Sequence, residues 1–358
     1  MDKPRNYGYD VLRIIAISMV AIIHTNSSFL WNEPSKTFAA LIMIELTGLC
    51  VSSVPLFFMI SGALLLDSEK TVSIKDLYTK RILKQFIPFA LWSILYTVIR
   101  IAAGKIPLSF SSFFMLFHEP AYSQFWFMYT LLGIYLLLPF LQILANKLTK
   151  NQFTYLLIIW FVFSVAVPLL THYFPSFSIS NHVDLVLSEG YIGYFLLGFY
   201  LKKYKSNVSG KQGLLLFAGG TVLTGVTVWI EWLNTKVPYA IRVGNTYGNY
   251  LLPGVLMSAI GLFVYFQNKD FSVSGRAKAV ISKLSFLTMG VFYIHMLFVL
   301  AFEKTVQISG LNIIELIIRA ILVIVASFVS IFVLSYIPYL NKFLVGYQTK
   351  NKEVKNDT

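Results

Sequence analysis

The chain has 358 residues, of which 57% are hydrophobic and only 13% carry a charge. Soluble globular proteins carry about 25% charged residues, so this composition excludes an ordinary soluble enzyme, a disordered chain and a nucleic-acid-binding protein of the usual kind. The net charge is nevertheless +13. Because so few positions have room for a charge, the basic residues are best interpreted by their place along the chain.

Ten apolar segments are candidates to cross a bilayer, which takes about 20 residues in a helix. The second segment is long and the sixth is short. In chain order they are roughly 10–30, 38–66, 86–102, 124–146, 153–173, 188–201, 213–233, 249–266, 284–302 and 313–338. We therefore predict an all-α, polytopic membrane protein with about ten transmembrane helices.

The amino-terminal segment is predicted to be the first span and not a cleaved signal. Arg13 interrupts the apolar stretch, and no pair of small residues typical of a cleavage site comes after it. No linker or repeat divides the chain, so we expect one transmembrane domain over 1–341 and a polar cytoplasmic tail over 342–358. Cys50 is a lone cysteine in an apolar run, which favours a small buried hydrophobic residue.

The basic residues predict the orientation of the spans. With the amino terminus placed inside, 21 of the 29 lysines and arginines fall in inner segments and five in outer segments. Arg13, Arg100 and Arg319 lie in spans or at their edges. Cytoplasmic loops carry the excess of basic residues in membrane proteins, so we expect both termini in the cytoplasm.

Two residues of the first span, Arg13 and His24, are eleven positions apart. At about 100° per residue they lie within roughly 20° of one face, separated by about 16 Å along the helix axis. Charged and titratable side chains inside spans are functional candidates, and imidazole can exchange a proton near neutral pH. Alternatively, Arg13 reaches the headgroups and pairs with Asp10, and His24 bonds to another helix.

A second basic cluster precedes the third span in KDLYTKRILKQFIPF. At helical spacing, Lys80, Arg81 and Lys84 share a face. They are expected either to anchor this helix at the inner membrane surface or to clamp the phosphates of a nucleotide-like cofactor.

Four further residues are candidates for contact with a substrate. Trp126 and Tyr129 begin the fourth span; they are typical of an interfacial aromatic belt and also suit stacking on a sugar. His295 in VFYIHMLF is another intramembrane histidine, for which a structural role is the alternative. Glu45 is a buried acid of the second span, and we hypothesise that it balances one of the two basic groups of the first span.

Other chemistries have no clear pattern. The remaining histidines show no metal-ligand spacing and no CxxC occurs, so no metal is predicted. Neither a GxxxxGK segment nor a GxGxxG segment after a strand is present, which disfavours an ATP-driven pump. A polysaccharide exporter stays open as the alternative function, although no inverted repeat relates 1–180 to 181–358.

The ordered motifs resemble the bacterial acyltransferase-3 family of integral membrane O-acyltransferases. YDVLRIIAISMVAIIH resembles the family's opening arginine–histidine motif, with Arg13 and His24 in place, and SSVPLFFMISGALLL resembles its second-span signature. QFWFMYTLLGIYLLLPFL, GYFLLGFYLKK and VFYIHMLF fall where similar family segments fall. The chain ends without the appended hydrolase-like domain of a long subgroup, so it is closer to the short branch that acts on surface polysaccharides.

The resemblance implies an acyl-CoA co-substrate on the cytoplasmic side, usually acetyl-CoA, and no metal. It implies a hydroxyl of a cell-surface glycan or of its lipid-linked precursor as acceptor, and it makes Arg13 and His24 the essential pair. The family's second motif has two arginines three positions apart before the third span. Arg81 matches the first, and Lys84 stands at the second, where it offers a point charge without the arginine fork.

The mechanism is a hypothesis at this point. His24 takes the proton of the acceptor hydroxyl as general base and returns it to the CoA thiolate or to solvent, with a covalent acyl-imidazole as the competing route. Arg13 supports the acyl donor, and Lys80, Arg81 and Lys84 extend its site. We expect a multi-pass protein of the bacterial cell membrane with acyl-CoA, the glycan and the bilayer as partners, and no nucleic acid; assembly into a homo-oligomer stays open.

Overall fold

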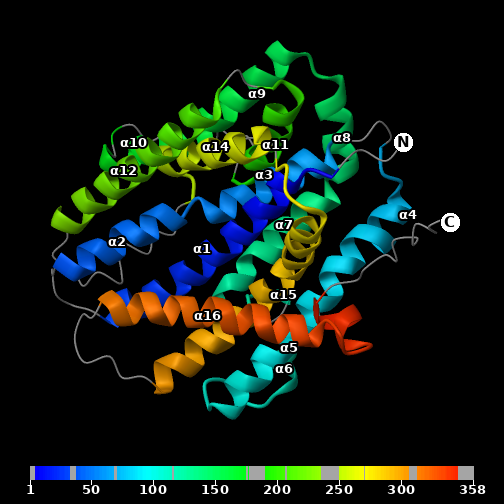
Figure 1. The fold of residues 1–358 in the computed structure, drawn as a ribbon, viewed down its shortest axis with the longest axis vertical. Coiled ribbons are helices and arrows are strands. Elements are labelled where there is room, and N and C mark those ends of the chain that lie inside the picture. Colours follow the sequence, from blue (N-terminus) through cyan, green and yellow to red (C-terminus); the bar gives the residue numbers. More distant parts are fainter. Residues whose placement is uncertain are drawn as a thin grey trace.

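The computed structural model describes residues 5–32, 38–67, 71–114, 117–174, 176, 190–205, 208–234, 250–269, 271–305 and 313–345. Within these ranges the chain is helical and contains no strand (Figure 1). The α-helices are α1 (Tyr7–Asn32), α2 (Phe38–Cys50), α3 (Ser53–Leu65), α4 (Ile74–Asp76), α5 (Leu83–Ala102), α6 (Phe110–Phe114), α7 (Trp126–Leu136), α8 (Leu138–Lys147), α9 (Lys150–Phe161), α10 (Val167–Tyr173), α11 (Ile192–Lys203), α12 (Gly210–Asn234), α14 (Pro253–Asn268), α15 (Gly275–Thr305) and α16 (Ile313–Leu334). Short π or 3-10 segments are η1 (Leu77–Ile82), η3 (Ser123–Phe125), η4 (Val162–Ala166) and η7 (Asn341–Val345).

Each of the ten predicted apolar segments contains a helix or a consecutive pair of helices. Seven helical stretches in the described chain are long and apolar enough to cross a membrane, and an eighth is the pair α7–α8, bent by 62°. The helices α11 and α14 have only 12 and 16 residues, and 16 residues span about 24 Å of a core about 30 Å thick. The polytopic all-α fold is thus confirmed, whereas the count of ten and the cytoplasmic termini stay predictions.

Two of the expected boundaries fall partly outside the described residues. The tail predicted for 342–358 begins within η7, and residues 346–358 lie outside the described ranges. The starts of the predicted spans at 188 and 249 also lie outside them.

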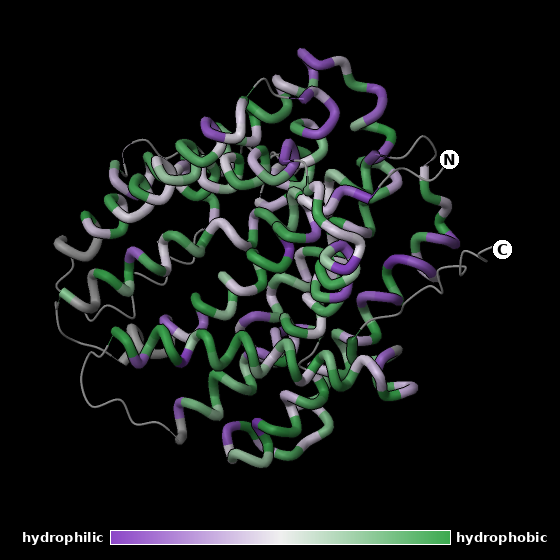
Figure 2. The backbone as a smooth tube through the Cα atoms, viewed as in Figure 1, coloured by the Kyte–Doolittle hydropathy of each residue, from purple (hydrophilic) through white to green (hydrophobic). Residues whose placement is uncertain are grey.

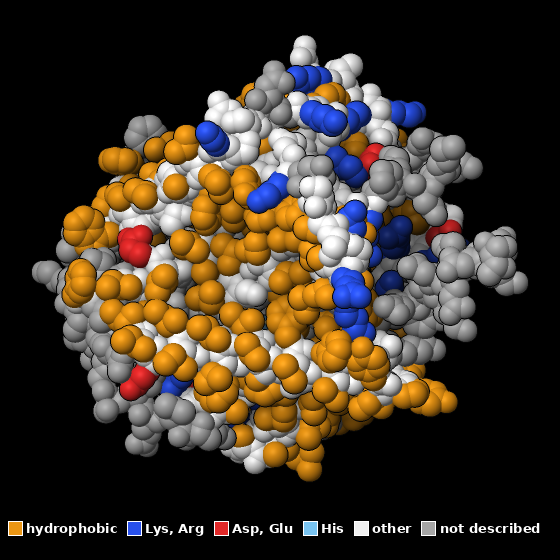
Figure 3. Space-filling view, in the orientation of Figure 1, with side chains coloured by type: hydrophobic (Ala, Val, Ile, Leu, Met, Phe, Trp, Pro, Cys, Tyr) orange, Lys and Arg blue, Asp and Glu red, His pale blue; other side chains and the backbone are white. Residues whose placement is uncertain are grey.

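The outer surface of the helices is apolar, as a lipid environment requires. The helix α16 exposes a row of large aliphatic side chains: Ile314, Ile317, Ile318, Ile321, Leu322, Val325 and Val329. Figure 2 shows hydrophobic residues along most helices, and in Figure 3 hydrophobic side chains cover most of the visible face, while lysines and arginines gather mainly along one margin. This distribution is the one expected of a protein whose solvent is the bilayer.

Glycines allow the closest helix contacts. A Cβ atom on Gly62 of α3 would overlap the backbone of Phe195 in α11, and one on Gly198 of α11 would overlap the backbone of Met59 in α3. The helices α12 and α14 approach each other through glycines in the same way, at Gly213, Gly220, Gly254 and Gly261. Small residues at such crossings let helices pack without a hydrophobic driving force from water.

The helices α1 and α15 lie side by side and run in the same direction. Near their beginnings Ser285 donates a hydrogen bond to Asp10 at 2.8 Å, and further along both helices the rings of His24 and His295 are 5.2 Å apart. Val345, at the end of the described chain, lines the same cavity as Arg13. The described chain therefore begins and ends on one side of the bundle, as an even number of crossings requires.

Candidate active site

Arg13 and His24 face the same interior region of the bundle through two neighbouring cavities. Arg13 lines a cavity of about 330 Å³, and His24 lines a small one of about 20 Å³. Three phenylalanines line both cavities and so form the wall between them; they are Phe57, Phe127 and Phe292. We call them the phenylalanine wall. The single face predicted for α1 thus has a structural counterpart, a polar cavity and a histidine cavity separated by aromatic rings.

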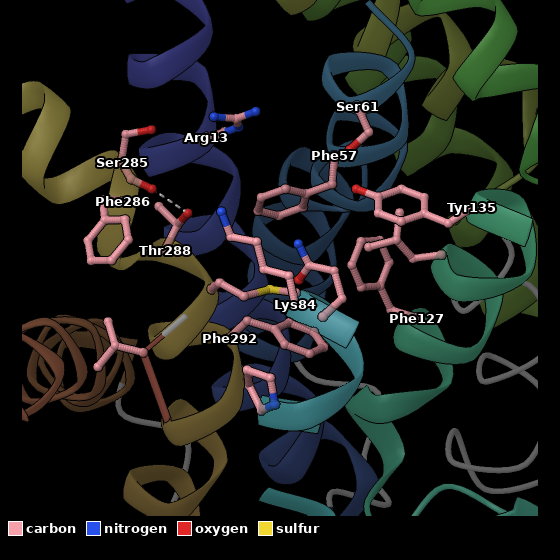
Figure 4. Close-up of a pocket in the computed structure, with 15 residues that line it drawn as sticks. Arg13, Phe57, Ser61, Lys84, Phe127, Tyr135, Ser285, Phe286, Thr288 and Phe292 are labelled. Atoms are coloured by element: carbon pink, nitrogen blue, oxygen red, sulfur yellow. Dashed lines mark hydrogen bonds between the residues drawn. The ribbon is translucent and has the colours of Figure 1, made fainter. Parts of the chain in front are cut away.

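The larger cavity is basic and rich in hydroxyl groups, and we call it the donor cavity after the acyl donor predicted beside Arg13. Arg13 from α1 and Lys84 from α5 supply the cations (Figure 4). Its hydroxyl-bearing lining residues come from three other helices and are Ser61, Tyr135, Ser285 and Thr288. Cations with several neutral donors around them suit an anionic ligand, because charge-assisted hydrogen bonds are the strong ones.

Asp10 lies one turn before Arg13 and is 3% exposed. Arg5 donates from Nε to Oδ2 at 2.6 Å and from Nη2 to Oδ1 at 3.2 Å, and Ser285 donates to Oδ1 at 2.8 Å. Arg13 stands 3.9 Å from the same carboxylate. The expected local pair of Asp10 and Arg13 is therefore present but long, and Arg5 is the closer counter-ion.

This arrangement leaves the Arg13 guanidinium available to the donor cavity. The hydrogen bond to Asp10 raises the pKa of Arg5 above its ordinary value, in spite of partial desolvation. Arg5 stays charged at every working pH, and its positive charge balances the negative charge of the Asp10 carboxylate.

The members of the basic cluster before the third span have different surroundings. Residues Leu77–Ile82 form a π-helix, in which Leu83 N–H donates to the Tyr78 carbonyl. Lys80 is exposed and pairs with Asp76 at 2.8 Å, whereas Lys84 lines the donor cavity. Of these two lysines, Lys84 is therefore the one that the structure places at the cavity.

Proline contributes to the position of Lys84. Pro88 comes four residues later inside α5 and also lines the donor cavity. A proline has no N–H to offer the carbonyl four residues earlier, so the helix does not use the Lys84 carbonyl in the normal way. Arg81 is exposed, but it lies close enough to Lys84 and Tyr135 to act on both electrostatically.

Two histidines meet at the other end of this region. The ring centroids of His24 and His295 are 5.2 Å apart with an interplanar angle of 44°. His295 is fully buried, its Nδ1 is 3.2 Å from the Val291 carbonyl, and its Nε2 has no hydrogen-bond partner among the described residues. Because a carbonyl only accepts, Nδ1 carries the proton and Nε2 presents a lone pair.

Aromatic and amide groups complete the small cavity around His24. Trp126 and Tyr250 line it and stack with ring centroids 5.5 Å apart. The Tyr194 hydroxyl donates a hydrogen bond to the Tyr250 carbonyl at 2.6 Å. Gln124 also lines the small cavity, is 2% exposed, and lies close to the Tyr96 hydroxyl. Its amide brings both a hydrogen-bond donor and an acceptor to this cavity.

Two predicted substrate contacts lie elsewhere. Tyr129 packs edge-on against Phe89, and its hydroxyl donates to the Glu119 carbonyl; it lines neither cavity among the described contacts. The Glu45 carboxylate lies where a Cβ atom on Gly225 of α12 would stand, so it faces α12. The structure gives no sign of the hypothesised balance between Glu45 and the basic groups of α1.

Several lining residues were not among the sequence predictions. Ser61, Gln124, Tyr135 and Tyr250 lie in α3, in η3, in α7 and just before α14, and the packing of these segments brings them to the two cavities. Gln124, a polar residue beside an aromatic run at the start of a span, is the one position that a search for intramembrane polar groups would have found.

No group of three or more histidine, cysteine, aspartate or glutamate side chains suited to a metal ion occurs in the part of the chain that the structure describes. His118 and His172 are exposed, and His182 lies outside the described residues.

Comparisons with known proteins give one match. Neither a curated protein nor a solved structure matches the chain significantly. The family model described as an acyltransferase domain matches residues 6–340, and thus includes both cavities up to η7. Members of this family are acyltransferases, and the match covers nearly the whole chain. The chain belongs to the acyltransferase-3 family and is a membrane acyltransferase.

Proposed function

We propose that the protein moves an acyl group, acetyl in the first place, from cytoplasmic acyl-CoA to a hydroxyl of a cell-surface glycan or its lipid-linked precursor. One observation carries this proposal: a basic cavity and a histidine cavity adjoin along one face of α1. The first suits an anionic acyl donor, and the second offers a base at the far side of a thin aromatic wall.

The donor cavity is proposed to hold the pantetheine arm and the phosphate next to it. Its volume of about 330 Å³ is at the low end of ligand pockets, which span about 300–1,000 Å³, so the nucleotide would lie outside, toward Arg81. The planar guanidinium of Arg13 can donate two parallel hydrogen bonds to a phosphate or donate to a carbonyl, and Lys84 adds a point charge. Lys80, paired with Asp76 on the surface, is expected to contribute little.

In the proposed transfer, His24 accepts the proton of the acceptor hydroxyl while the hydroxyl oxygen forms a C–O bond to the thioester carbonyl carbon. The C–S bond then breaks, and the imidazolium returns the proton to the departing thiolate, which gives CoA–SH and the ester. The free lone pair of His295 Nε2, 5.2 Å away between ring centroids, can receive an N–H from His24 and fix its tautomer, as the third member of a triad does.

The acceptor is proposed to approach the small cavity from the opposite side. Trp126 stacks with Tyr250 and also lies 5.1 Å from the ring of Tyr191. Such a cluster offers apolar ring faces of the kind that pack against sugars, and the Gln124 amide can bond a hydroxyl. This part of the proposal retains Trp126 as a substrate contact and gives Tyr129 a structural role.

The cell membrane of a bacterium, with both termini inside, is the proposed setting. The return of the described chain to the side where it begins and the basic margin in Figure 3 support an even number of crossings with that side in the cytoplasm.

The test is mass analysis of surface glycans and lipid-linked precursors from cells with the protein, without it, and with His24→Ala. We expect a mass shift of one acyl unit only with the unmodified chain. His172→Ala, at an exposed histidine of α10, is the matched control and should preserve the shift. An exporter would instead change the amount of glycan outside the cell without changing its mass.

A further inference from the structure

The wall between the two cavities is made of rings that cannot easily move aside. Phe127 is 6.0 Å from Phe57 and 5.5 Å from Phe292 between centroids. Phe127 also packs against Phe58 at 4.9 Å, and Phe292 against Phe125 at 6.3 Å. The wall residues come from α3, α7 and α15, so a shift of any ring would disturb the packing of three helices.

The two cavities differ greatly in size. One water molecule needs about 10–15 Å³ when volume is measured for water-sized probes. The cavity at His24, about 20 Å³, therefore has room for little more than one water-sized group, such as a methyl. The donor cavity, about 330 Å³, is already assigned to the pantetheine arm and its phosphate in the proposed function. The acyl carbons beyond the carbonyl then have the small cavity to enter.

We propose that the phenylalanine wall restricts the transferred acyl group to acetyl. This inference rests on the proposed function, since the thioester carbonyl has to reach His24 between the three rings. The acyl carbons beyond the carbonyl then enter the small cavity, whose lining includes Val54 and the wall residues themselves. A methyl group fits there, and each further methylene overlaps a ring.

The size of the effect can be judged from the packing. In a rigid apolar pocket, one methylene changes kcat/KM by roughly 10- to 200-fold. Butyryl-CoA should accordingly be a poor donor and hexanoyl-CoA a worse one. Removal of one ring should relax this ranking with little effect on binding of the CoA moiety, because Arg13 and Lys84 stay in place.

The experiment uses membranes from cells that express the full chain, which also contain the natural acceptor. Acetyl-, butyryl- and hexanoyl-CoA are supplied in parallel, and the acyl increments on extracted glycans are measured by mass spectrometry. The variants are Phe57→Leu and Phe292→Leu. Phe58→Leu is the matched control, because Phe58 contacts Phe127 but lines neither cavity. The ratio of hexanoyl to acetyl transfer within one preparation does not depend on how much protein has folded.

We expect the unmodified protein to prefer acetyl, and Phe57→Leu or Phe292→Leu to raise the hexanoyl-to-acetyl ratio about tenfold or more, with Phe58→Leu unchanged. If the unmodified protein transfers acetyl but neither wall variant changes the ratio, the inference is overturned and the proposed function stands. If Phe58→Leu changes the ratio equally, general loosening replaces the wall as the cause, which also overturns it. A protein that transfers no acyl group from any donor overturns the proposed function and the inference together.

Discussion

A substitution of Arg5 tests whether the ion pair between Arg5 and Asp10 leaves Arg13 available to bind the acyl donor. Arg5 is about half exposed, is absent from the described lining of the donor cavity and of the His24 cavity, and approaches Asp10 to 2.6 Å, while Arg13 is 3.9 Å from the same carboxylate. In Arg5→Ala the buried carboxylate loses its nearest cation. Arg13 needs to move only about 1 Å to reach hydrogen-bond distance, which is near 2.8 Å for a charged pair, and it then turns away from the donor cavity.

The expected loss is one charge-assisted hydrogen bond to the acyl donor, about 1.5–3 kcal/mol. Since 1.36 kcal/mol corresponds to a factor of ten, the KM for acetyl-CoA should rise roughly 10- to 150-fold in Arg5→Ala, with a smaller change in kcat. The raised pKa of Arg5 keeps it charged in the unmodified protein across the neutral range, so the effect should not vary with pH there.

The assay is the initial rate of acyl transfer in membranes as a function of acetyl-CoA concentration. The double variant Arg5→Ala with Asp10→Asn is the control, because the amide can still accept from Ser285 but no longer attracts Arg13. We expect it to recover most of the lost affinity. An unchanged KM in Arg5→Ala, or a double variant no better than the single one, would refute this account of Arg13.

Three further predictions concern single positions. Lys84→Ala should raise the KM for acyl-CoA about tenfold. Lys80→Ala breaks only an exposed pair with Asp76 and should leave this KM within twofold. Equal effects of the two variants would show that Lys80 also contributes to binding of the donor. His295→Leu should lower kcat about ten- to a hundredfold without changing the KM for the donor and should shift the pH profile of kcat, because it removes the lone pair opposite His24; an unchanged pH profile would make His295 structural. Gly198→Ala should destabilise the detergent-solubilised protein by about 1–3 kcal/mol because its Cβ would overlap the α3 backbone, whereas Gly133→Ala, with open space around it, should not lower the melting temperature.

The face shared by Arg13 and His24 could be predicted from the sequence because α1 is one uninterrupted α-helix from Tyr7 to Asn32. A regular helix conserves its phase over eleven residues, so spacing alone places both side chains. Spacing does not tell, however, that Lys80 pairs with Asp76 at the surface while Lys84 lines the donor cavity. Those surroundings depend on which helices pack around α5.

The neighbours of that face could not be predicted. His24 and His295 are 271 positions apart in the sequence and meet only because α1 and α15 run parallel. Nothing in the composition of an apolar helix states which of its faces meets which neighbour, since lipid-facing and buried sides are equally hydrophobic. For the same reason Trp126 and Tyr129, equivalent in the sequence, separate in the fold, one at the His24 cavity and one against α5.

The neighbours of the basic residues show that the surplus of positive charge has more than one role. Lys202 bonds to the carbonyl of Ala63 and pairs with Asp67, and Lys203 bonds to the carbonyl of Ala145, so these lysines of the last turn of α11 also cap the ends of α3 and α8. Arg13 and Lys84 differ from them, because both point at one cavity and the nearby carboxylate is already neutralised by another cation. A basic cavity without a full counter-charge is costly in the empty protein, and an anionic donor that enters it supplies the missing partner. In the proposed function, the same electrostatic cost that makes such residues rare in membranes becomes binding energy for acyl-CoA.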